Sequence, residues 1–159
     1  MKDFPSNKNK FIKLLNFFEE IVRICKGIRI EPIIYGSLAV FIYTKNNDIK
    51  VNDIDALVQE KDFGKIIKTL KERKIKFKYD KKWHTMHIFK DKHKIELDSI
   101  EYWLKDLPHN FKKLNFNGIS IKILNINTLR KVYEKASEVS QDYSEEYKKK
   151  FKDLANNSK

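Results

Sequence analysis

The sequence predicts an α/β or α+β fold, in which helices pack on a β-sheet. Segments with the apolar spacing of helices alternate with short apolar segments typical of strands, in the order helix, strand, helix, strand, helix and then several strands. The chain has 159 residues, of which 41% are hydrophobic and 35% charged. This size and composition suit one domain with one core. We expect a single domain over residues 1–141 and a charged tail over residues 142–159, helical or partly disordered.

The first half of the chain is expected to form two helices and two strands. Apolar residues from Phe11 to Cys25 recur at the three- and four-residue steps of an amphipathic helix, and Gly27 suits its end. The next expected elements, in order, are a strand Ile30–Tyr35, a short helix Ser37–Tyr43 capped by Ser37, and a strand Asn52–Val58.

The second half is expected to contain two helices and four strands. Phe63–Leu70 has helical spacing, with Asp62 placed where a negative charge favours the helix dipole. A turn at Asp91-Lys92 predicts that the strands on either side pair as a hairpin. The remaining segments are the strands Ile75–Tyr79, Thr85–Phe89, His93–Ile100 and Ile119–Leu124 and the helix Leu129–Val139.

Composition excludes several classes of protein. No segment approaches the roughly 20 apolar residues that span a bilayer, and residues 1–10 are polar, so we expect a cytoplasmic protein without membrane contact. The single cysteine, Cys25, excludes an internal disulfide framework and a cysteine-based zinc site. The net charge of +12 favours anionic partners such as nucleotides, RNA or acidic proteins.

Three acidic residues are candidate metal ligands. Asp53 and Asp55 are two residues apart in an expected strand, so their carboxylates share one face and repel each other unless a cation lies between them. A hard divalent cation with oxygen ligands, Mg²⁺, suits this pair. Asp98 lies on a later strand and comes alongside if the strands are neighbours, about 4.8 Å apart. It would serve as a third ligand or a base, and Glu96, on the same face, is the alternative.

Gly36 and Ser37 are a candidate phosphate-binding element. A strand that ends in glycine and is followed by a helix start presents free backbone N–H groups and the positive end of a helix dipole. The Ser37 hydroxyl adds a further donor. By itself such a serine is more often only a helix cap, and a lone Asp-x-Asp pair is equally unspecific.

Together these elements resemble the polymerase-beta-type nucleotidyltransferase superfamily. The shared features are the strand ending in Gly36-Ser37, the following helix, Asp53-x-Asp55 after fifteen intervening residues, and the third acid Asp98. The resemblance covers roughly residues 10–125 and is closest to small single-domain members, namely the minimal, lincosamide, aminoglycoside and abortive-infection-toxin-like nucleotidyltransferases. It implies a mixed sheet of about four or five strands flanked by helices.

The resemblance also implies an activity and a set of roles. A nucleoside monophosphate would pass from a nucleoside triphosphate, ATP in the first instance, to a hydroxyl acceptor. Gly36 and Ser37 would hold the triphosphate, Asp53, Asp55 and Asp98 would bind Mg²⁺, and Asp98 would help activate the acceptor. Asn52 departs from the pattern, because many relatives carry serine or a basic residue there. The acceptor, a small molecule, a protein or an RNA end, does not follow from these residues, nor do the preferred base and the oligomeric state.

A second interpretation is a catalytically inactive module of the same fold that works through RNA or a partner protein, as in a toxin–antitoxin pair. Its basis is a basic stretch around Lys74, Lys76 and Lys78 interleaved with Phe77, Tyr79 and Trp83, a pattern that suits phosphate contacts and base stacking.

Overall fold

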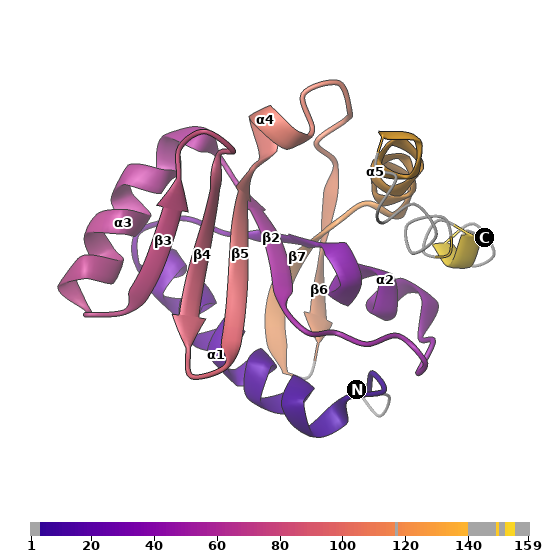
Figure 1. Ribbon diagram of the computed structural model, residues 1–159, viewed down its shortest axis with the longest axis horizontal. Coiled ribbons are helices and arrows are strands. Elements are labelled where there is room, and N and C mark those ends of the chain that lie inside the picture. Colours follow the sequence, from indigo (N-terminus) through magenta and orange to yellow (C-terminus); the bar gives the residue numbers. More distant parts are fainter. Residues whose placement is uncertain (1–3, 117, 140–148, 150–151, 155–159) are drawn as a thin grey trace.

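The computed structural model describes residues 4–116, 118–139, 149 and 152–154. In this part of the chain, seven strands form one sheet with the order β3-β4-β5-β2-β1-β7-β6 (Figure 1). The strands are β1 (Ile33–Tyr35), β2 (Ile54–Val58), β3 (Lys76–Asp80), β4 (Thr85–Lys90), β5 (His93–Ser99), β6 (Phe111–Phe116) and β7 (Ile119–Leu124). The helices are α1 (Lys8–Gly27), α2 (Gly36–Thr44), α3 (Phe63–Glu72), α4 (Ile100–Trp103) and α5 (Ile126–Val139), with a 3₁₀ turn η1 (Glu60–Asp62) before α3.

The sheet is mixed. Strand β2 at its centre pairs antiparallel with β1 and parallel with β5. On one side β3, β4 and β5 form antiparallel hairpins, and on the other β1 runs parallel to β7, which pairs antiparallel with β6. The predicted class, a mixed β-sheet flanked by helices, is therefore confirmed, although the sheet has more strands than the four or five expected.

Helix α1 forms because its apolar residues follow one stripe, and that stripe is buried. Phe11, Leu14 and Ile21 have no exposed surface, and Cys25 is buried as expected. The ring of Phe11 lies 6.3 Å from that of Phe41 in α2 and 6.2 Å from that of Phe116 in β6, centroid to centroid. Each side chain of this kind contributes about 1.5–3 kcal/mol when fully buried.

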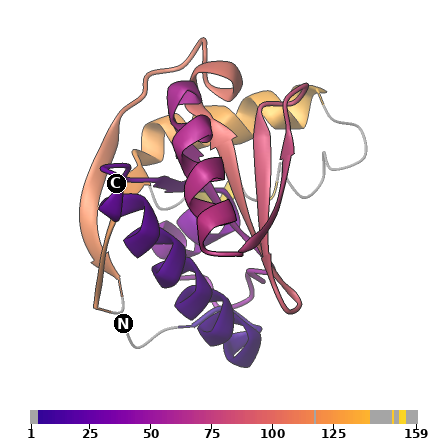
Figure 2. The same cartoon turned by 90° about the vertical axis from the view of Figure 1, so that its left-hand side faces the viewer.

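Helix α3 packs on the same face of the sheet as α1. Its Phe63 ring lies 5.0 Å from that of Tyr79 in β3. Figure 2 shows α1 and α3 between the strands β3, β4 and β5 on one side and the β6–β7 pair on the other. The side chains that face the helices are apolar and almost fully buried: Ile34, Ile54, Ala56, Met86, Ile88, Ile95 and Leu97. Because strand side chains alternate, the polar residues between them project to the opposite face.

The predicted hairpin and most helix boundaries are confirmed, whereas the cap at Ser37 is wrong. The turn between β4 and β5 is Asp91-Lys92, with Asp91 at φ +54°. Helix α2 begins at Gly36, and Tyr35 occupies the cap position without a side-chain cap hydrogen bond. Gly36 has φ +72°, so the chain turns from strand into helix one residue earlier than a serine cap would allow.

Three elements were not predicted: β6, α4 and the 3₁₀ turn η1. Strand β6 is an edge strand with mostly exposed side chains, and its sequence Phe-Lys-Lys-Leu-Asn-Phe lacks regular alternation. Helix α4 is a single turn, capped by the Ser99 hydroxyl, which accepts from the Tyr102 N–H at 3.2 Å. One turn is too short to show helical spacing.

Much of the predicted tail, residues 142–159, lies outside the described residues. Of this range the structure describes 149 and 152–154, where residues 152–154 are helical and Leu154 is buried. Among the helices in the described part of the chain, none combines the length and apolar character needed to cross a membrane.

Asn7 links the start of α1 to the loop that leads into β2. Its side-chain amide donates to the Val51 carbonyl at 2.7 Å and its side-chain oxygen accepts from the Val51 N–H at 3.1 Å. Val51 is fully buried, so both backbone groups depend on this amide. The contact fixes the loop two residues before Asp53.

We predict that Asn7→Ala destabilises the protein by about 2 kcal/mol, because two buried backbone groups lose their partner. Urea unfolding followed by circular dichroism measures this change. Asn9→Ala is the matched control, since Asn9 is exposed in the first turns of α1. Equal stability of the two variants would contradict the proposed link.

Candidate active site

The acidic residues lie on the face of the sheet opposite α1 and α3. Strand pairing aligns Tyr35 with Asp55, Asp55 with Glu96, and Glu96 with His87 in one row across four strands. The next row contains Asp98, aligned with Leu57 on one side and Thr85 on the other. Paired residues project to the same side of a sheet, so these rows build one polar surface.

Gly36 brings the start of α2 into contact with Asp55. A Cβ atom at position 36 would lie 2.4 Å from Asp55 Oδ2 and 3.0 Å from its Cβ, closer than atoms can approach. The positive φ of Gly36 also favours glycine. The absence of a side chain therefore allows the carboxylate of Asp55 to lie directly against the first residue of the helix.

Ser37 is the second residue of α2 and lines the same cavity as Asp53 and Asp55. The first N–H groups of a helix have no partner within the helix, and its N-terminus carries a partial positive charge. The cap residue Tyr35 makes no side-chain cap hydrogen bond to them. The amide groups of its first turn are therefore well placed to bind an anion beside the acidic pair.

Asp98 is buried, with 2% of its surface exposed, and hydrogen bonds engage both of its carboxylate oxygens. The Tyr35 hydroxyl donates to Oδ2 and the Thr85 hydroxyl donates to Oδ1. Burial, followed by the negative charge of Glu96, raises the pKa of Asp98 from 3.8 to about 8. Burial and the nearby carboxylates of Asp98 and Asp55 also raise the pKa of Tyr35, so its hydroxyl stays protonated and donates.

Two further contacts engage carboxylates of the cluster, and one of them brings a positive charge. The Lys94 ammonium lies 3.4 Å from Asp53 Oδ2. His87 Nε2 lies 2.8 Å from Glu96 Oε1. Burial, with the positive charge of Lys94, lowers the pKa of His87 below 6.5, so at neutral pH this ring is a hydrogen-bonding group rather than a cation.

A cavity of about 630 Å³ collects these residues. Its lining includes every residue that the sequence analysis singled out as a candidate, namely Gly36, Ser37, Asp53, Asp55, Glu96 and Asp98. Further lining residues are Tyr35, Thr85 and His87 from the strands, Trp83 before β4, Trp103 at the end of α4, and Val132 and Tyr133 from α5, none of which the sequence analysis assigned to this site. The alternation of Thr85 and His87 on one strand was the available signal for these two.

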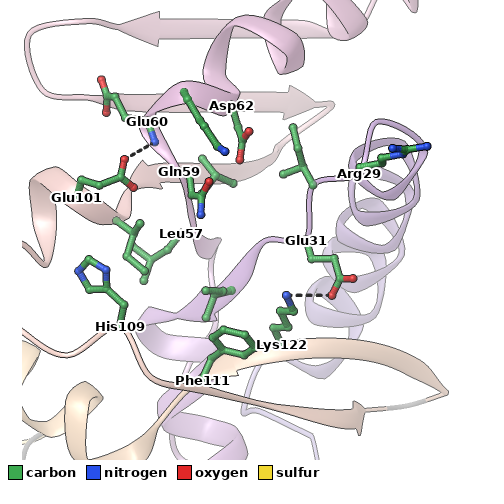
Figure 3. Close-up of a pocket in the computed structure, with 15 residues that line it drawn as sticks. Arg29, Glu31, Leu57, Gln59, Glu60, Asp62, Glu101, His109, Phe111 and Lys122 are labelled. Atoms are coloured by element: carbon green, nitrogen blue, oxygen red, sulfur yellow. Dashed lines mark hydrogen bonds and ion pairs between the residues drawn. The ribbon is translucent and has the colours of Figure 1, made fainter.

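A larger cavity of about 900 Å³ has Leu57, Glu60, Glu101, His109, Phe111 and Lys122 in its lining (Figure 3). Leu57 and Phe111 give it an apolar wall, and the Lys122 ammonium lies 3.3 Å from Glu31 Oε2 beside them. At its opposite end the Glu60 N–H donates to Glu101 Oε2 at 2.8 Å. None of the candidate residues lines it, so we place the site in the smaller cavity, which holds the acids.

The donor set of the smaller cavity fits Mg²⁺. Within residues 4–116, 118–139, 149 and 152–154, no group of three His, Cys, Asp or Glu side chains is close enough to hold a metal ion. Mg²⁺ commonly takes one or two protein carboxylates and completes its shell with water and substrate phosphates. Asp53 and Asp55, beside the amide groups of α2, match that requirement. The part of Asp98 as a ligand stays a prediction, because both its oxygens accept hydrogen bonds from hydroxyl groups.

Comparison with known proteins shows the fold. No protein-family profile matches the chain, and no curated protein matches it in sequence. Solved structures do match. ANT(2'')-Ia in complex with adenylyl-2''-tobramycin aligns with a TM-score of 0.67 and 10% identity, covering 89% of this chain and 87% of that one. An antigenic nucleotidyltransferase-like protein from Paracoccidioides brasiliensis has a TM-score of 0.61 and 12% identity, over 90% and 75% of the two chains.

The lincosamide antibiotic adenylyltransferase LnuA, bound to lincomycin, aligns with a TM-score of 0.56 and 12% identity, over 93% of this chain and 98% of that one. The fold of the chain is thus that of the polymerase-beta-type nucleotidyltransferases. At these identities the comparison shows the shared fold, and the geometry of the cavity has to carry the argument for function.

We predict that Gly36→Ala destabilises the protein, by about 1–3 kcal/mol from backbone strain with the cost of displacing Asp55 in addition. Gly64→Ala is the matched control, because Gly64 lies in helix α3 with nothing within 4 Å of an added Cβ. That control is expected to gain about 1 kcal/mol from helix propensity. Thermal unfolding of both variants measures the difference, and a neutral Gly36→Ala would refute the close contact with Asp55.

The raised pKa of Asp98 predicts how stability depends on pH. The folded chain holds the proton to about pH 8, whereas an aspartate in the unfolded chain releases it near 3.8. The stabilisation from this proton is therefore complete below pH 3.8, declines as pH rises and is lost above about pH 8. Asp98→Asn removes the titrating group and should flatten this decline.

Urea unfolding in EDTA, at a series of pH values between about 5 and 8, measures the slope for both proteins. Asp48→Asn, at an exposed loop position, is the control for loss of one carboxylate. Parallel slopes for the wild-type protein and Asp98→Asn would show that Asp98 does not carry the raised pKa.

Proposed function

We propose that the chain is a Mg²⁺-dependent nucleotidyltransferase that moves a nucleoside monophosphate from a nucleoside triphosphate, ATP in the first instance, to a hydroxyl acceptor. The observation that carries this proposal is the contact between Gly36 and Asp55. It sets the N-terminus of α2, where backbone N–H groups and the positive end of the helix dipole favour anions, directly against a pair of carboxylates that suits a divalent cation.

The start of α2 binds the triphosphate. Backbone N–H groups of its first turn and the Ser37 hydroxyl donate hydrogen bonds to phosphate oxygens. Gly36 keeps this element close to the carboxylates because it has no side chain to hold them apart. The triphosphate is thereby oriented with its α-phosphorus toward the middle of the cavity.

Asp53 and Asp55 would hold Mg²⁺, which neutralises charge on the phosphate oxygens and on the leaving pyrophosphate. Lys94 beside Asp53 orients that carboxylate. Without a cation, the two carboxylates would repel the triphosphate that the helix start attracts.

A cation held by Asp53 and Asp55 would lower the pKa of Asp98, and the ionised carboxylate would then accept the proton of the acceptor hydroxyl. Tyr35 and Thr85 fix its orientation, and they must yield or share one oxygen when the hydroxyl binds. The hydroxyl oxygen forms a bond to the α-phosphorus, the bond from this phosphorus to the bridging oxygen breaks, and pyrophosphate leaves. Glu96, held by His87, is the alternative base.

The structural neighbours indicate which acceptors to test first. The ANT(2'')-Ia structure contains adenylyl-2''-tobramycin, and LnuA is named a lincosamide antibiotic adenylyltransferase and was solved with lincomycin. Both names refer to antibiotics that receive an adenylyl group. Hydroxyl-bearing antibiotics are therefore reasonable first acceptors for this chain, with ATP as the donor.

The decisive test is transfer of label from α-³²P-labelled ATP to acceptors, with Mg²⁺ and with EDTA. Asp55→Asn keeps the shape of the side chain against Gly36 but removes its charge, so transfer should fall by about a thousandfold or more. Asp48→Asn, at an exposed position, should retain full activity. Transfer by Asp55→Asn at the wild-type rate, with an unchanged melting temperature, would sink the proposed function.

A further inference from the structure

Two exposed tryptophans form one wall of the acidic cavity. Trp83, before β4, is 48% exposed and Trp103, at the end of α4, is 46% exposed. Both line the cavity that holds Asp55 and Asp98. Large aromatic side chains are normally buried, so two of them held open beside a polar cavity require an explanation. We call this pair the aromatic wall.

The aromatic wall is fixed in place. The Trp103 indole Nε1–H donates to the Trp83 carbonyl at 3.0 Å, and the Trp83 N–H donates to Asp80 Oδ1 at 3.2 Å. The ring of Tyr102 meets Trp103 edge to face at 5.3 Å and stacks on His84 at 4.1 Å. These contacts hold the two side chains in place before a ligand binds. Binding therefore costs less side-chain conformational entropy.

The position of the aromatic wall along the cavity assigns it to the acceptor. By strand register, Gly36 lies next to the Asp53–Asp55 end, and Asp98 lies one row further along, beside Thr85. Trp83 precedes Thr85 by two residues along the chain. Asp98 therefore lies between Trp83 and the start of α2. In an in-line displacement the attacking hydroxyl and the leaving pyrophosphate lie on opposite sides of the phosphorus. The triphosphate end is at α2, and the aromatic wall is therefore on the side of the attacking group.

The charge of the cavity indicates the kind of acceptor. Its ionisable lining includes Asp80 and Glu96 in addition to the three aspartates of the site, whereas Lys76 and Lys78 of β3 are not part of it. Beyond the divalent cation, this lining repels a polyanion such as an RNA strand. A volume of about 630 Å³ is within the range of small-molecule sites.

We propose, on the basis of the function proposed above, that Trp83 and Trp103 bind a small-molecule acceptor that carries a flat ring next to its reacting hydroxyl. The ring, aromatic or the apolar face of a sugar, stacks on the indoles and presents the hydroxyl to Asp98. The aromatic wall thus determines acceptor specificity, while α2 and the acidic pair bind the nucleotide.

The test uses the fluorescence of the full chain, whose only two tryptophans form the aromatic wall. Tobramycin, lincomycin and a twelve-nucleotide RNA are titrated with ATP and Mg²⁺ present. At least one of the two ring-bearing antibiotics should change the fluorescence saturably, whereas the RNA should not. The double variant Trp83→Ala/Trp103→Ala has no tryptophan, so its binding is measured by equilibrium dialysis. The Kd of the antibiotic that changed the wild-type fluorescence should rise by about tenfold or more, because stacking on aromatic faces is lost. The Kd of ATP should be unchanged.

Two controls separate binding from folding. Trp83→Phe/Trp103→Phe keeps flat rings and should recover most of the affinity measured by dialysis. Phe111→Ala removes an exposed ring that lines the larger cavity and should leave acceptor binding unchanged. The melting temperatures of all variants show that the fold persists.

The possible failures can be told apart. If the wild-type chain does not bind ATP with Mg²⁺, the proposed function fails and the assignment of the aromatic wall fails with it. If ATP binds but neither antibiotic changes the fluorescence, or the alanine double variant binds them as well as wild type, only the aromatic wall is wrongly assigned. Loss of ATP affinity in that variant would place the nucleotide base on the tryptophans, and a response to RNA alone would indicate a polymer acceptor. Either result overturns the proposal.

Discussion

The backbone pairing of β2 with β1 on one side and with β5 on the other determines where every acidic side chain of the site lies. This pairing aligns Tyr35, Asp55 and Glu96 in one row. A slip of one residue in either pair would send one member of the row to the face that packs on α1 and α3. The buried apolar residues between the acids, such as Ala56 and Leu97, resist that slip because they would become exposed. The core thus stabilises the register, and the register builds the site.

The chain has a net positive charge, whereas the charged side chains that line the acidic cavity are negative. The net charge of +12 attracts polyphosphates over long range, yet the cavity into which they would enter gathers five carboxylates. Protein groups compensate only part of this charge: Lys94 pairs with Asp53, and Asp98 receives two hydroxyl hydrogen bonds. Asp98 therefore holds its proton to about pH 8. A bound cation would complete the compensation, which explains why a chain would retain so many acids in one place.

The sequence was sufficient to select Gly36, Asp53 and Asp55, because strand alternation and the strand-to-helix turn depend on local spacing. Local spacing could not reveal Tyr35 as the partner of Asp98, since that contact joins residues 63 positions apart and depends on the strand order. The same limit applies to the tryptophans, which meet only after β4 and β5 pair. Strand β6 escaped prediction for another reason: edge strands carry little buried surface, so their sequences show weak alternation.

One hydrogen bond in the lining of the acidic cavity joins the two strands on either side of β2. Tyr35 is aligned with Asp55, whereas Asp98 is aligned with Leu57, so the bond from the Tyr35 hydroxyl to Asp98 crosses β2 between these two rows. Tyr35 and Asp98 line the acidic cavity, and Leu57 lines the larger one. Because burial raises the pKa of Tyr35, the hydroxyl remains a donor and the ring stays across β2. The contact that orients the proposed base therefore also ties β1 to β5 across β2, where the lining of the acidic cavity gives way to that of the larger one.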